Sequence, residues 1–187
     1  MNGTPTGLPG LRVRAMTPSD CRPVAEIRVG GWRSAYAGLV PRSYLDAMDV
    51  EEDAERRRRM LAKAGNPVVN LVAERDGEIV GWAAYGPYRD GAVRTGDAEL
   101  YALYTRPGHL GTGVGTALLC ESAERCAAAG HPSLFLWVLK DNARARRFYA
   151  RHGFTADGAE EPFEADGTEV PEVRYVRELG AVGVQAP

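Results

Sequence analysis

The alternation of hydrophobic and polar positions predicts strands along this chain. Leu11, Val13 and Ala15 alternate with arginines, as in a half-buried strand. Residues 134–139 are continuously apolar, which is typical of a central strand covered on both faces. The dipeptide Asp76-Gly77 between two apolar segments predicts a tight hairpin turn. The predicted strands are residues 11–15, 68–74, 78–85, 99–105, 134–139 and 173–179.

Helix signals fall between these strands. Ser19 or Asp20 caps the first helix, which we expect to end at the pair Gly30-Gly31. Asp141 is the expected cap of the last helix. The predicted helices are residues 20–29, 51–63, 113–129 and 141–152, with short helical pieces at 32–36 and 41–48. Because helices interleave with strands and one hairpin is antiparallel, we expect a mixed α/β sheet rather than a doubly wound parallel one.

A length of 187 residues suits one domain. We expect this domain to span residues 11–179, between loose tails at 1–10 and 180–187. Hydrophobic residues make up 44% and charged residues 26%, near the averages of globular proteins. No apolar run approaches the roughly 20 residues that cross a bilayer, and no secretory signal is visible. These features predict a cytoplasmic protein without a membrane partner.

The charge pattern argues against a nucleic-acid partner. The formal net charge is −2, whereas phosphate binding needs a basic surplus. Arginines 56–59 form a basic run, yet glutamates precede the first and last of them by four residues, the favourable ion-pair order on a helix. A solvated helix face is therefore favoured over an RNA contact. Cys21, Cys120 and Cys126 lack the close spacing of metal ligands, so we expect no metal site.

A glycine-rich loop, defined by Gly111, Gly113 and Gly115, follows one predicted strand and opens a helix. Backbone N–H groups at a helix start form an anion site suited to phosphate. The nucleotide P-loop would need a Lys-Ser/Thr pair after the last glycine, but Thr116-Ala117 follows. The dinucleotide fingerprint would need a glycine where Thr116 or Leu118 stands. Both nucleotide motifs are therefore excluded.

The loop instead resembles the pyrophosphate-binding motif of the GNAT superfamily of acyl-CoA-dependent N-acetyltransferases. The pattern Gln/Arg-x-x-Gly-x-Gly/Ala falls on Leu110, Gly113 and Gly115, and Leu110 departs from it. A second block, residues 134–154, is similar to the family's later strand, its Asn and its Phe-Tyr-x-x-x-Gly-Phe signature. The two blocks stand in the family's order, and the similarity covers about residues 11–179.

The resemblance implies a mostly antiparallel, twisted sheet with helices on both faces. Two parallel strands, 99–105 and 134–139, would splay apart and admit the pantetheine arm of acetyl-CoA. Main-chain groups of the first strand would pair with pantetheine, and amides of the loop would hold the pyrophosphate. Asn142 would anchor the arm or order the next helix, although a simple turn residue also fits. The implied cofactor-binding residues are Leu103, Tyr104, Thr105, Leu110, Gly111, Thr112, Gly113, Val114, Gly115, Thr116 and Asn142.

Two residues are candidates for catalysis. Tyr149 resembles the family's general acid, whose phenol protonates the departing thiolate; an ordinary core aromatic is the alternative. Glu99 begins a strand on the acceptor side and could take a proton from an ammonium group, directly or through water. A strand-end charge that faces solvent is the alternative for Glu99, and Asp97 is the competing candidate. Alternation places Glu99, Tyr101 and Leu103 on one face.

The acceptor site is indicated by aromatic residues. Residues 32–38 resemble a Trp-Arg-x-x-Tyr-x-Gly signature of one bacterial branch, in which early helices wall the acceptor pocket. The candidate acceptor-binding residues are Trp32, Tyr36 and Tyr101, although core packing explains Trp32 equally well.

These features predict an N-acetyltransferase that moves acetyl from acetyl-CoA to the primary amine of a small molecule by direct attack. No Cys in the motifs supports a covalent intermediate. A protein N-terminal or lysine acetyltransferase and a non-catalytic acyl-CoA-binding regulator are the alternatives. The sequence leaves the identity of the amine, the length of the acyl group and a homodimer open.

Overall fold

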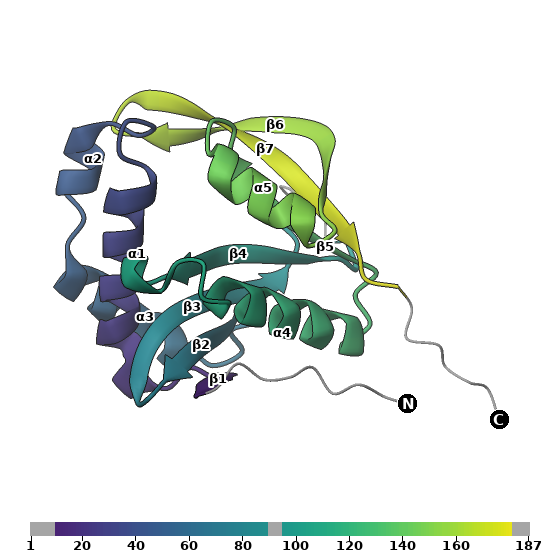
Figure 1. Cartoon of the computed structure of the whole chain (residues 1–187), viewed down its shortest axis with the longest axis horizontal. Helices are drawn as coiled ribbons and strands as arrows, with labels where there is room; N and C mark the ends of the chain where they lie inside the picture. Colours follow the sequence, from purple (N-terminus) through teal and green to yellow (C-terminus); the bar gives the residue numbers. More distant parts are fainter. Residues whose placement is uncertain (1–9, 90–94, 181–187) are drawn as a thin grey trace.

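Seven strands of the described part of the chain form one sheet in the order β1-β2-β3-β4-β5-β7-β6 (Figure 1). The computed structural model describes residues 10–89 and 95–180. Neighbouring strands are antiparallel except β4 and β5, so the expected mixed, mostly antiparallel sheet is confirmed. The strands are β1 (Leu11–Ala15), β2 (Val69–Arg75), β3 (Glu78–Pro87), β4 (Ala98–Thr105), β5 (Ser133–Leu139), β6 (Thr155–Ala165) and β7 (Thr168–Glu178).

Helices cover both faces of the sheet, as expected (Figure 1). One core lies between the sheet and α4, and it includes Leu71, Leu118 and Phe154. A second core lies between the sheet and α1, and it includes Ile27 and Trp82. The helices are α1 (Cys21–Ala35), α2 (Arg42–Asp46), α3 (Val50–Ala62), α4 (Val114–Ala128) and α5 (Ala143–Arg151).

Helix α1 continues through Gly30-Gly31, so the predicted end of this helix was wrong. The predicted helical piece at 32–36 is in fact its last turn. Gly31 is buried, and a Cβ atom there would lie 3.2 Å from the ring of Tyr104. The glycine therefore allows α1 to approach β4 closely, and this packing outweighs the low helix propensity of glycine.

The cap of α5 is Asn142, not Asp141 as predicted. The Asn142 side-chain oxygen accepts a hydrogen bond from the Ala145 N–H at 3.1 Å. Asn142 therefore orders the start of α5, in agreement with one of the two roles expected for it.

Strand β6 was not predicted, and β7 begins five residues earlier than the predicted strand at 173–179. The side chains of β6 are mostly exposed, so no alternation of apolar and polar residues marks it. A register shift between Ala156 and Glu160 further breaks the pattern. Asp166 and Gly167, with φ of 52° and 76°, join β6 to β7 in the same way as Asp76 and Gly77 join β2 to β3.

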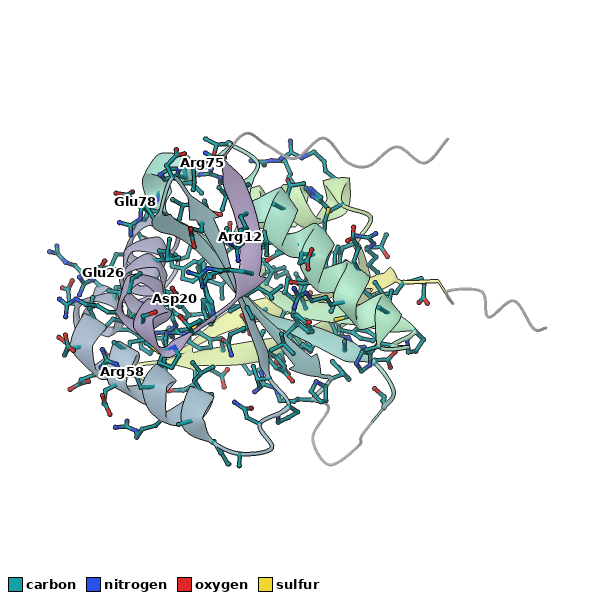
Figure 2. All side chains as sticks on the ribbon, turned by 90° about the horizontal axis from the view of Figure 1, so that it is seen from below. Arg12, Asp20, Glu26, Arg58, Arg75 and Glu78 are labelled. Atoms are coloured by element: carbon teal, nitrogen blue, oxygen red, sulfur yellow. The ribbon has the colours of Figure 1, made fainter. Side chains whose placement is uncertain are left out.

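An ion pair connects β1 to the start of α1, where Figure 2 labels Asp20. Arg14 donates to both carboxylate oxygens of Asp20, at 2.7 and 2.9 Å, and to Glu74 at 2.8 Å. The backbone N–H and the hydroxyl of Thr17 also donate to Asp20. These hydrogen bonds, that from Arg14 first, lower the pKa of the buried Asp20 to about 2.

Three further expectations concern the tails, a membrane-spanning helix and the arginine run. The predicted tails at 1–10 and 180–187 lie almost wholly outside the described residues. Among the described residues, no helix is both long and apolar enough to cross a membrane. Arginines 56–59 lie on α3, where Glu55 contacts Arg58 at 3.2 Å and Arg59 at 3.8 Å.

Candidate active site

Strands β4 and β5 part soon after they meet. They pair only at Ala98 with Leu134 and at Glu99 with Phe135, and the remaining residues of both strands run apart. The expected splayed parallel pair is therefore present. The opening between β4 and β5 is lined by main-chain groups that no neighbouring strand occupies on that side.

A β-bulge interrupts β4 at this opening. Leu100 pairs with Tyr85 and Ala102 with Ala84, which leaves Tyr101 without a partner in the ladder. Past the bulge, Leu103 packs in the α4 core, whereas Ala102 and Tyr104 pack on the α1 side. The prediction that Glu99, Tyr101 and Leu103 share one face was therefore wrong, because the extra residue reverses the alternation.

The glycine loop brings together the residues expected to hold the pyrophosphate, which are Leu110, Gly111, Thr112, Gly113, Val114, Gly115 and Thr116. Gly111 and Gly113 have φ of 78° and 86°, a conformation that side chains disfavour. The first amide of α4 with a backbone acceptor is that of Ala117, which donates to Gly113 at 2.9 Å. The amides of Val114, Gly115 and Thr116 are thus available to an anion, whereas those of Leu110 and Thr112 donate to the Pro107 and His109 carbonyls at 3.3 Å.

Arg75 at the end of β2, labelled in Figure 2, is hydrogen-bonded to this loop. Its guanidinium donates to the Thr112 hydroxyl at 3.1 Å and to the Thr112 carbonyl at 3.2 Å. On the other side, the Thr116 hydroxyl lies 3.1 Å from Nε2 of His152. The loop is therefore held from both β2 and the end of α5.

Tyr149 lies on α5 at the same opening. Its ring contacts Phe148 and Phe154, with centroids 5.3 and 5.8 Å away. Burial, and secondarily the proximity of the Tyr104 hydroxyl, raise the pKa of Tyr149 above its usual value. The phenol is therefore protonated at neutral pH and can donate a proton.

Aromatic residues from α1 and β4 meet on the other side of the opening. The indole N–H of Trp32 donates to the Tyr104 hydroxyl at 2.7 Å, and the hydroxyls of Tyr36 and Tyr104 are hydrogen-bonded. The rings of Trp32 and Tyr36 lie 4.7 Å apart. Trp32 and Tyr36 are thus neighbours at the end of α1, and their role in acceptor binding stays a prediction. Tyr101 lies apart from them, because its hydroxyl donates to the Pro87 carbonyl.

Glu99 is buried and is in contact with Arg89. Its carboxylate accepts from the Arg89 backbone N–H at 3.2 Å and lies 3.8 Å from the Arg89 guanidinium. Burial raises the pKa of Glu99, and the charge of Arg89 opposes this effect. The competing candidate, Asp97, precedes β4, and its carbonyl accepts from the Tyr88 N–H at 3.0 Å.

Two further carboxylates near the opening were missed by the sequence reasoning. Glu161 on β6 and Glu172 on β7 are directly opposite each other in the antiparallel ladder. Burial, followed by the negative charges of Glu161 and Glu99, raises the pKa of Glu172 to about 7. The Asp166-Gly167 turn was the available signal, since it predicts a hairpin that brings these glutamates together.

The described residues also include thiols and possible metal ligands. Within residues 10–89 and 95–180, no three His, Cys, Asp or Glu side chains are grouped as metal ligands would be. Cys126 is buried, and burial raises the pKa of its thiol to about 12. This thiol is therefore protonated at neutral pH.

Comparisons with known proteins agree with this geometry. The sequence profile of the acetyltransferase (GNAT) family matches residues 32–154. An uncharacterized N-acetyltransferase of Bacillus subtilis, YuaI, is 30% identical over 164 residues, which are 87% of this chain and 90% of that protein. The PaiA N-acetyltransferase from Thermoplasma acidophilum, in complex with coenzyme A, superposes with a TM-score of 0.72 at 20% identity, over 90% of this chain and 98% of that chain. The ribosomal-protein-alanine N-acetyltransferase from Brucella melitensis gives a TM-score of 0.72 at 22% identity, over 89% and 99%.

The mixed sheet, with a parallel strand pair that parts after two residue pairs and a glycine loop that opens a helix, matches the fold of known acetyltransferases. The chain belongs to the GNAT family of acetyltransferases.

Proposed function

We propose that this chain transfers the acetyl group of acetyl-CoA to the primary amine of a small molecule by direct attack. The observation that carries this proposal is the opening between β4 and β5, with Tyr149 on the α5 side and glutamates near it. Acetyl-CoA fits the residues that are present, because the glycine loop offers amides to the pyrophosphate and the bulged strand offers main-chain groups to pantetheine.

The donor would lie along β4. Main-chain groups of Leu103, Tyr104 and Thr105 would pair with pantetheine, and the glycine loop would hold the phosphates. Asn142 would act by ordering α5, which carries Tyr149.

The proposed reaction couples proton transfer at the amine with proton transfer at the leaving thiolate. The amine loses a proton to a carboxylate at the opening and then attacks the thioester carbonyl carbon. A C–N bond forms, the C–S bond breaks, and the thiolate takes the proton of Tyr149. One of the two protons on the new nitrogen then leaves to solvent, and Tyr149 regains a proton from solvent. The products are an amide and free coenzyme A.

The test is release of free thiol from acetyl-CoA with a panel of acceptors. The panel holds propylamine, 1,3-diaminopropane, benzylamine and β-alanine, together with peptides that carry a free N-terminus or a lysine. Turnover with a small amine supports the proposal. Turnover with peptides alone supports a protein acetyltransferase, and binding of acetyl-CoA without any turnover supports a regulator; either result contradicts the proposal.

A further inference from the structure

Glu161 and Glu172 form a like-charge pair, which we call the hairpin glutamates. They are cross-strand neighbours on β6 and β7, and like charges directly opposite each other destabilise a sheet. Two residues closer to the β6–β7 turn, the next cross-strand pair on the same face is Phe163 with Val170. These two side chains pack against Trp32. The hairpin glutamates therefore face the side where the acceptor residues Trp32 and Tyr36 lie.

The Glu172 carboxylate is not paired with a cationic side chain in the part of the chain that the structure describes. Among the described residues, no hydrogen bond or ion pair engages it. Arg174, the next residue on that face of β7, donates to Asp157 at 2.7 Å and to the Tyr88 hydroxyl. Lys140, at the end of β5, contacts Glu160 at 2.8 Å. Within residues 10–89 and 95–180, the neighbouring cations are thus already paired, which leaves the Glu172 carboxylate available to a cationic ligand.

The other groups that face Glu172 are anionic or neutral. They are Glu161 from β6, Glu99 from β4, and the phenols of Tyr36 and Tyr104. Glu99 differs from Glu172 because it already accepts from Arg89. Glu172 is half-buried and titrates near neutral pH, with its pKa raised to about 7, which suits a group that must both accept and release a proton.

We propose that Glu172 binds the ammonium group of the acceptor and accepts its proton, and that Glu161 adds negative charge that favours positively charged aliphatic amines. This inference rests on the proposed function and assigns the base to β7 rather than to Glu99. The proton passes from R–NH₃⁺ to the Glu172 carboxylate and then to solvent, and the neutral amine attacks the thioester. An alkyl ammonium has a pKa of about 10, so without such a base little free amine is present at neutral pH.

The experiment is the pH profile of kcat/KM between about pH 6 and about pH 10, with the most active small amine of the panel. The wild type should show a rising limb near pH 7, since Glu172 must be ionised. Glu172→Gln should lose this limb, fall about tenfold or more at pH 7, and recover as alkaline buffer deprotonates the amine. Glu169→Gln on the same strand is the matched control and should behave as the wild type.

Each outcome bears on the inference. A Glu172→Gln profile that keeps the limb, or loss of the limb in Glu99→Gln but not in Glu172→Gln, overturns it. The hairpin glutamates should also favour 1,3-diaminopropane over β-alanine, and Glu161→Gln should reduce this preference. An unchanged preference overturns the role proposed for Glu161. Melting temperatures report folding, and Glu172→Gln should melt no lower than the wild type because it removes a repulsion. If the wild type turns over no small amine, the proposed function has failed; an active wild type with an unaffected Glu172→Gln variant refutes only this inference.

Discussion

At the scale of single residues, the ring and the hydroxyl of Tyr149 have different expected roles, packing for the ring and catalysis for the hydroxyl. Its ring packs between Phe148 and Phe154, while its hydroxyl is the group proposed to protonate the thiolate. Tyr149→Phe keeps the ring and removes the hydroxyl, so we expect kcat to fall about tenfold or more with little change in acetyl-CoA affinity. Steady-state kinetics and calorimetry measure the two quantities. An unaltered kcat, with the chemical step shown to limit the rate, would leave Tyr149 with a structural role alone.

Asp20 is a residue whose charge stabilises the fold. Its pKa is lowered to about 2, from an ordinary value of 3.8, chiefly by the hydrogen bonds from Arg14. Because the folded pKa is the lower one, the stabilisation is complete above about pH 4 and is lost as the pH falls through about 2. The shift corresponds to about 2 kcal/mol.

Asp20→Asn should therefore lower the free energy of unfolding by about 2 kcal/mol at pH 7 and by progressively less below about pH 4. Urea unfolding of the wild type and of Asp20→Asn, at pH 7 and at about pH 3, measures how the loss of free energy depends on pH. Glu26→Gln is the control, since Glu26 is exposed and lies 3.4 Å from Arg22; we expect a change below about 1 kcal/mol. A difference that does not depend on pH would show that the charge of Asp20 is not the cause.

At the scale of elements, the first turn of α4 is the proposed anion site. Gly113 has a positive φ, so any side chain there strains the backbone, but Gly115 has no such restriction. A Cβ at Gly115 would lie 3.5 Å from Phe148 and from Thr105, which is ordinary contact. Gly115→Asp should fold, because acidic residues suit a helix start, and should weaken acetyl-CoA binding about tenfold or more through repulsion of the pyrophosphate. Calorimetry measures this affinity; Gly115→Ala is the matched control, and equal affinities in the two variants would contradict the site.

Most elements could be predicted from local signals, and the failures have tertiary causes. The apolar run of β5 and the Asp76-Gly77 turn need only neighbouring residues to be recognised. The predicted end of α1 was wrong because Gly31 lies within the helix, where it makes room for the ring of Tyr104. Tyr104 is far from Gly31 in the sequence, so no local signal reveals this contact. The motif located the loop and Tyr149, whereas Glu172 has no motif. Its role depends on a register with Glu161 that only the folded hairpin defines.

At the scale of the whole molecule, acetyl-CoA should stabilise the fold if it binds across the opening, as proposed. At about one hundred times its dissociation constant, a ligand adds about 2.7 kcal/mol. For a chain of this size this corresponds to a rise of about 5–10 °C in Tm. Scanning calorimetry measures the shift, and hydrogen exchange should slow most at Leu103, Thr105 and the first turn of α4. A folded protein whose Tm does not respond to acetyl-CoA would contradict donor binding at this opening.

The parting of β4 and β5 also leaves two strand edges inside the sheet. Backbone N–H and C=O groups on an unpaired edge can recruit a strand from another chain, which is how many proteins aggregate. Most proteins have such edges at the margins of a sheet, where charged residues or bulges protect them. Here the edges lie at the centre, joined through only two residue pairs. The co-substrate that the reaction requires is thus also the molecule that would shield the most vulnerable backbone of the fold from aggregation.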